Sequence, residues 1–75
     1  MRRVGEVVRV AQGLAVLRCP DAEHPQLGTA VFDEDLETVG RVVDVFGPAG
    51  RPYLAVSPDA GVTPARLLGR PLYAR

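Results

Sequence analysis

Valine and leucine recur along the chain in short runs that glycine and proline interrupt. Twelve valines set between eight glycines and seven prolines describe short strands with frequent turns. Valine suits a pleated, half-buried surface because it branches at Cβ, whereas glycine and proline mark turns. The pattern predicts six strands, over residues 3–10, 14–18, 29–33, 39–46, 53–57 and 71–75.

The connections between these runs carry recognisable turn chemistry. Gln12-Gly13 lies between the first two strands and predicts a tight hairpin. Residues 20–28 form the longest polar connection, and Asp33-Glu34-Asp35 predicts the solvated tip of a second hairpin.

One short segment, TPARLLG, predicts a helical turn. Thr63 can cap free amides, Pro64 suits the first helical position, and Gly69 can adopt the left-handed closing conformation. The segment has room for one or two turns, so the chain is predicted to be all-β with this single helical turn.

The length of 75 residues allows one domain, spanning residues 1–75. Six short strands either expose two unpaired edges or close on themselves, and at this size closure is the simpler solution. We therefore predict a small six-stranded antiparallel β-barrel.

Charge and cysteine content exclude several classes of protein. Nine basic and nine acidic residues give no net charge, which argues against a domain that holds nucleic acid by electrostatics alone. The single cysteine cannot form an internal disulfide, and the N-terminal segment does not resemble a signal peptide. No apolar segment is long enough to cross a membrane, so we expect a cytoplasmic protein.

The titratable clusters are weak candidates for chemistry. In CPDAEH, Cys19, Asp21, Glu23 and His24 lie on one polar loop, without the paired ligands of a zinc site or the third group that orients a catalytic histidine. FDEDLE lacks the spacing of a calcium loop, and GPAG matches an RNA-gripping GxxG motif only in its letters. We therefore expect no catalytic residue, metal, cofactor or small-molecule substrate.

The strand over residues 39–46 has apolar residues on both faces if its side chains alternate regularly. A barrel interior accepts only one of these sets. The following loop, FGPAGRPY, places two aromatic residues beside a rigid proline and glycine turn, which is typical of interface anchors. The expected partner-binding residues are Val43, Val45, Phe46, Gly47, Pro48, Pro52 and Tyr53.

The whole chain resembles the Gar family of the H/ACA ribonucleoprotein. The resemblance includes RRVGEVVRVAQGLAVLRC, HPQLGTAVFDEDLETVG and LLGRPLYAR, and is most specific in VGRVVDVFGPAGRPYLAV. The positions that carry it there are Gly40, Val42, Asp44, Phe46, Gly47, Pro48, Pro52 and Tyr53. The glycine-arginine-rich tails of eukaryotic members are not in this sequence, which resembles the archaeal form.

The resemblance implies a six-stranded barrel and a non-catalytic role. A Gar protein docks on the catalytic domain of a pseudouridine synthase and meets guide RNA only indirectly, through the complex. It aids substrate loading and product release in rRNA pseudouridylation, within ribosome biogenesis.

One alternative family remains open at this point. The VGxVxDV strand also resembles the PRC-type barrel, an adaptor domain of ribosome maturation and other assemblies, although FGP followed by PY is not expected there.

Overall fold

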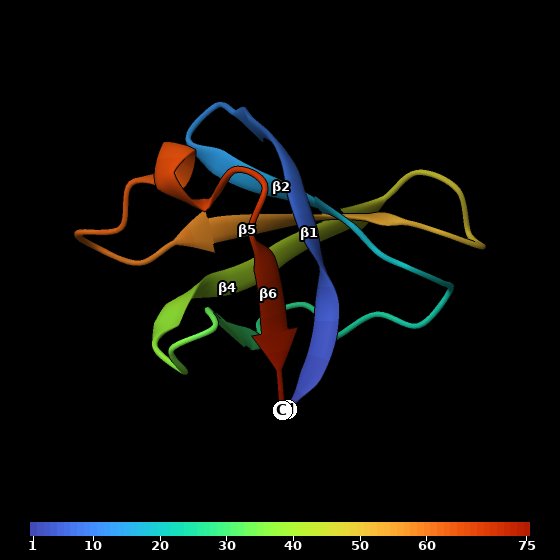
Figure 1. Ribbon diagram of the computed structural model, residues 1–75. Coiled ribbons are helices and arrows are strands. Elements are labelled where there is room, and N and C mark those ends of the chain that lie inside the picture. Colours follow the sequence, from blue (N-terminus) through green and yellow to red (C-terminus); the bar gives the residue numbers. More distant parts are fainter.

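The computed structural model describes residues 1–75 as six strands and one 3-10 helix (Figure 1). The elements are β1 (Arg2–Ala11), β2 (Leu14–Arg18), β3 (Ala30–Phe32), β4 (Thr38–Phe46), β5 (Tyr53–Pro58), η1 (Pro64–Leu67) and β6 (Pro71–Ala74). Every predicted strand is present, with ends that differ from the predicted ones by at most one residue.

The strands close into one antiparallel barrel in the order β1-β2-β5-β4-β3-β6, which confirms the predicted fold. β1 joins β6 along most of its first half, so the two ends of the chain lie side by side (Figure 1). The junction between β3 and β6 is the shortest, since Phe32 and Tyr73 are its only pair in register.

The barrel interior is filled by aliphatic side chains, and no polar side chain is buried. Leu17, Leu54 and Leu72 are its largest fully buried members, contributed by β2, β5 and β6. Burial of apolar surface stabilises the fold by roughly 25 cal/mol per Å² removed from water. Leu67 adds the contribution of η1, which lies over one end of the barrel (Figure 1).

Irregularities in β1 and β4 bend these two long strands around the core. The register of β1 shifts at Val4 and Val8, and that of β4 shifts at Val39 and Val43. A β-bulge adds one unpaired residue, which increases the local twist and redirects the side chains that follow. These shifts allow nine- and ten-residue strands to wrap around so small a barrel.

The predicted turns form, with one correction. Gln12 and Gly13 both have positive φ, of 53° and 77°, as a two-residue hairpin turn with matching twist requires. Gly69 adopts the left-handed conformation expected of it, at φ 80°. The capping role predicted for the Thr63 side chain is wrong, because only its backbone carbonyl accepts a bond, from the Arg66 amide at 3.0 Å.

Candidate docking site

A row of side chains crosses the outside of the barrel at the level where β4 ends and β5 begins. Glu6 of β1 is opposite Arg18 of β2, Arg18 is opposite Tyr53 of β5, and Tyr53 is opposite Phe46 of β4. Residues in register on one face of a sheet are close enough for their side chains to pack. The row therefore brings together residues that are far apart in the sequence.

The Tyr53 ring is held between two neighbours in this row. The Phe46 ring stacks on it, with centroids 5.6 Å apart and an interplanar angle of 20°. The Arg18 guanidinium lies 4.7 Å from the Tyr53 ring centroid and donates a hydrogen bond of 2.7 Å to the phenolic oxygen. Aromatic stacking and a cation over a ring each favour one geometry, so Tyr53 is fixed before any partner arrives.

Two bulge residues widen the apolar surface around these aromatics. Val8 is 48% exposed and Val43 is 47% exposed, because each is the unpaired residue of its bulge. Phe46 is 38% exposed and Tyr53 is half-buried. We refer to Val8, Val43, Phe46 and Tyr53 as the aromatic face.

The loop from Gly47 to Pro52 supports the aromatic face from one side. Gly47 has a φ of 87°, and a side chain there would begin 2.9 Å from Cδ2 of Tyr53. The Arg51 amide donates to the Pro48 carbonyl at 3.2 Å, and the buried Pro52 accepts a bond from the Cys19 amide at 2.9 Å. The loop is consequently a tight turn tied to β2.

The structure separates the seven residues expected to bind a partner into two groups. Val43, Phe46, Gly47 and Pro48 are exposed, and Tyr53 is partly so. Pro52 is buried, and Val45 packs partly against the core. Regular alternation along residues 39–46 predicts that Val43 and Val45 share one strand face. This prediction is wrong, because the bulge at Val43 places Val42 and Val45 inside.

Val8 and Arg18 were not predicted, and the reason lies in the register. A regular hairpin closed by Gln12-Gly13 would place Val7, not Glu6, opposite Arg18. The bulge at Val8 changes this pairing, and no residue in β1 marks the bulge in the sequence. The positions of the glycines and prolines therefore could not have revealed this part of the face.

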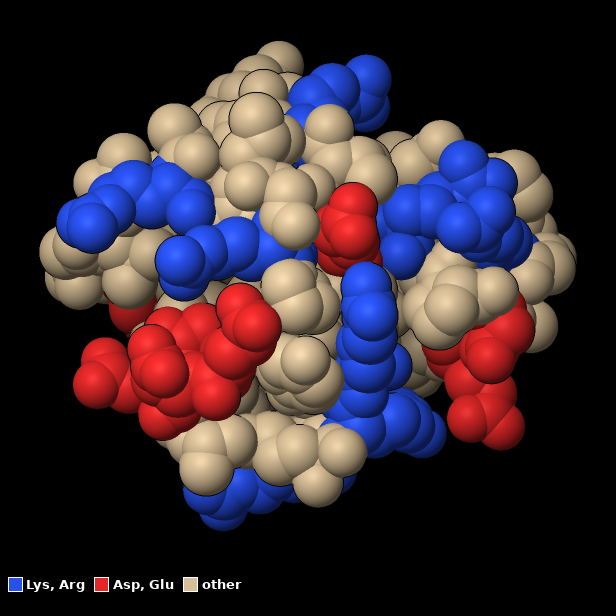
Figure 2. Space-filling model, viewed as in Figure 1, with Lys and Arg blue, Asp and Glu red and all other residues tan.

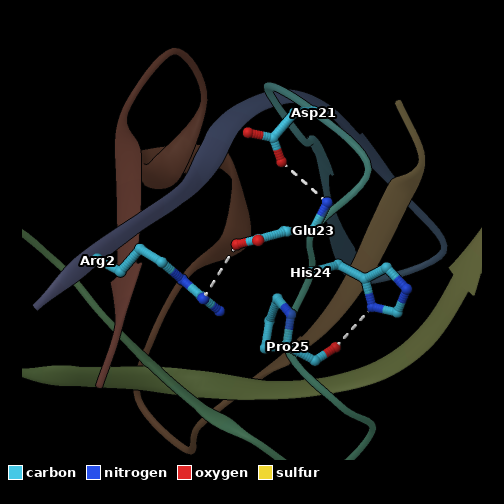
Figure 3. A network of polar contacts seen from close by, with 5 residues as sticks. All are labelled: Arg2, Asp21, Glu23, His24 and Pro25. Atoms are coloured by element: carbon cyan, nitrogen blue, oxygen red, sulfur yellow. Dashed lines mark hydrogen bonds and ion pairs between the residues drawn. The ribbon is translucent and has the colours of Figure 1, made fainter. Parts of the chain in front are cut away.

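The CPDAEH segment is divided between the core, which contains Cys19, and a solvated loop. Cys19 is fully buried, and burial, with a smaller contribution from Asp21, raises the pKa of its thiol. Glu23 pairs with Arg2 at 3.6 Å, and His24 Nδ1 lies 2.9 Å from the Pro25 carbonyl (Figure 3). The side chains therefore satisfy local contacts instead of converging.

The acidic segment forms the hairpin tip that the sequence predicted. Oδ1 of Asp33 accepts bonds from the Asp35 and Glu37 amides, at 2.8 and 3.1 Å. Figure 2 shows acidic side chains gathered at the lower left, where this tip lies in Figure 1, and basic and acidic groups interspersed elsewhere. The face in view has no continuous basic stripe.

The described residues form neither a metal site nor a membrane-spanning helix. No three of the His, Cys, Asp and Glu side chains lie close enough together to hold a metal ion. The single 3-10 helix is far too short to span a bilayer, and no other helix is present. The fold and surface define a small closed β-barrel with an exposed aromatic face.

Comparison with known proteins identifies the family. The family described as "Gar1/Naf1 RNA binding region" matches residues 1–74, so the chain belongs to the Gar1/Naf1 family. A protein of Methanothermobacter thermautotrophicus, described as uncharacterized, is 30% identical over 70 residues, which are 93% of this chain and 75% of that relative. The match decides for the Gar family over the PRC-type barrel.

Membership places the chain among the components of the H/ACA ribonucleoprotein, which acts in rRNA processing. The family is a non-catalytic ribonucleoprotein component associated with RNA binding.

Proposed function

We propose that this chain is the subunit that docks on the catalytic subunit of an RNA-guided pseudouridine synthase and promotes exchange of its RNA substrate. It contacts guide RNA indirectly, through the synthase. The observation that carries the proposal is the aromatic face, where the exposed Phe46 stacks on the half-buried Tyr53 beside a hydrogen-bonded turn. Preorganised aromatics of this kind are typical anchors of protein interfaces.

The chemistry of the face supports a protein partner over a small molecule. Its apolar side chains lie on the open outside of the barrel, whereas small-molecule sites are enclosed. Burial raises the pKa of the Cys19 thiol, and this residue lies in the core and not on the aromatic face. A docking subunit without catalytic groups of its own would act by biasing the conformation of its partner.

Adding the chain to a complex of synthase and guide RNA should raise multiple-turnover pseudouridylation more than it raises the first turnover. Loop opening and product release limit many enzymes, and a docked subunit can stabilise the open state of a substrate-gripping loop. A difference of about 1.4 kcal/mol in its contacts with the two loop states would shift their equilibrium tenfold.

The measurement compares single-turnover and multiple-turnover rates with and without the chain. Phe46→Ala serves as the variant that should lose the effect. Equal multiple-turnover rates with and without the wild-type chain would contradict the proposed function, even if docking were observed.

The isolated chain should bind guide RNA weakly, with a dissociation constant in the range of about 10⁻⁶ to 10⁻⁴ M typical of non-specific contacts at physiological salt. Nine arginines are balanced by nine carboxylates, and Phe46 and Tyr53 stack on each other instead of offering separate faces to bases. Titration of the chain alone with guide RNA measures this. Tight, sequence-specific binding would favour direct RNA recognition as its primary role.

A further inference from the structure

Beside the aromatic face lies a shallow hollow in which positive charge is concentrated. Its volume is about 470 Å³, and its charged lining residues are Arg3, Glu6, Arg18 and Arg51. Val8 and Tyr53 line it too, so the hollow is continuous with the aromatic face. Three guanidinium groups and one carboxylate leave an excess of positive charge there, although the chain as a whole carries none.

Two of these arginines have no acidic partner within the chain. Glu6 is opposite Arg18 in the sheet, yet its carboxylate pairs with Arg3, at 3.7 Å. The other ion pair joins Arg2 to Glu23, which leaves Arg18 and Arg51 without a carboxylate. Arginine charges that line one hollow repel each other unless an anion is bound between them.

Each of Arg18 and Arg51 is held by one hydrogen bond from its guanidinium group, and other guanidinium N–H groups have no acceptor in the chain. Arg18 uses one terminal nitrogen to reach the Tyr53 hydroxyl, and its Nε is buried without an acceptor. Arg51 uses Nε to reach the Cys19 carbonyl, at 3.0 Å, so its two terminal nitrogens are free. A guanidinium held in this way presents a planar fork that matches a carboxylate.

We propose that this hollow receives an aspartate or glutamate side chain of the synthase, between Arg18 and Arg51, when the aromatic face docks. The inference rests on the proposed function, because the carboxylate belongs to the same partner. A protein carboxylate suits the hollow better than an RNA phosphate for two reasons. Val8 and Tyr53 line the hollow beside the arginines. The chain also lacks the net positive charge that strong binding to an RNA backbone requires.

The first test is binding of the synthase catalytic subunit by methionine variants. Methionine keeps a flexible apolar stem and removes the charge. Arg18→Met and Arg51→Met should each weaken binding about tenfold or more, because a charge-assisted hydrogen bond is lost in a desolvated contact. Arg66→Met, which removes an exposed arginine of η1 outside the hollow, should change affinity by no more than about twofold.

The second test identifies the partner group directly. The chain contains no lysine, so Arg51→Lys introduces one side-chain amine into the hollow. A carbodiimide joins an amine to a carboxylate without a spacer, and mass spectrometry then reports the residue joined. Arg51→Lys should couple to an aspartate or glutamate of the synthase, whereas Arg66→Lys should not.

The outcomes separate this inference from the proposed function. If the wild-type chain does not bind the synthase, the proposed function and the carboxylate inference are both contradicted. If it binds and the Arg18 and Arg51 variants bind equally well, or Arg51→Lys couples no more than Arg66→Lys, the hollow takes no carboxylate. If these variants lose affinity for guide RNA and keep their affinity for the synthase, the hollow takes a phosphate and the inference is overturned. Arg51 is exposed, so its variants decide the matter even if Arg18→Met fails to fold.

Discussion

Replacing Gly40 by alanine is expected to cost about 3 kcal/mol of unfolding free energy, the upper part of the usual range for a side chain inserted where there is no space. A Cβ at this position would meet the Ser57 carbonyl oxygen of the neighbouring strand and lie 2.8 Å from Cγ1 of Val56. The obstacle is backbone, so β4 and β5 would have to separate. A barrel of this size has only about 3–5 kcal/mol to lose.

Thermal melting followed by circular dichroism measures the effect, which corresponds to a fall of about 10 to 25 °C in Tm. Gly50→Ala is the matched control, because a Cβ there meets nothing within 4 Å and the residue is not in the left-handed region. It should be neutral, or stabilise by less than about 1 kcal/mol. Equal melting of the two variants would show that β4 and β5 do not approach as described.

Replacing Phe46 by alanine is expected to weaken docking on the synthase by about 2 kcal/mol, which is roughly a 30-fold rise in Kd. The sequence left open whether Phe46 or Tyr53 faces the core, and the structure places both on the outside of the barrel. Phe46 is 38% exposed and does not belong to the core cluster, and its ring stacks on Tyr53 at the surface. The stability cost should therefore be limited to its stacking on Tyr53, about 1 kcal/mol.

Titration calorimetry against the synthase, with melting measured on the same samples, separates docking from folding. Leu68→Ala is the control, because Leu68 is an exposed apolar residue, at 55%, that follows η1 and lies outside the aromatic face. It should bind normally. If Phe46→Ala melts and binds like the wild type, Phe46 is not part of the contact surface.

The strands and the closure of the barrel could be predicted because they depend on local chemistry. Valine runs, glycine and proline punctuation, and the Gln12-Gly13 turn each act within a few residues, and six short strands without protected edges have little choice but to close. The exposed position of Phe46 did not follow from this pattern, because regular alternation places Phe46 on the same strand face as Val42, which is buried.

The composition of the outer face could not be predicted in full, because it depends on bulges. A single unpaired residue at Val43 reverses the direction of every later side chain in β4, which moved Val45 inward. The bulge at Val8 in the same way brought Glu6 opposite Arg18. These shifts arise from the curvature of the closed barrel, a property of the whole fold that no short stretch of sequence carries.

The pairing of the first strand with the last has a consequence for synthesis of the protein. Arg2 is in register with Ala74, so the barrel cannot close until β6 has left the ribosome. Until then β1 has one unpaired edge, which can associate with other chains. Folds that depend on contacts between distant residues also form slowly. The edge of β1 is exposed only briefly, because at about 5–20 residues per second β6 is synthesised only seconds after β1.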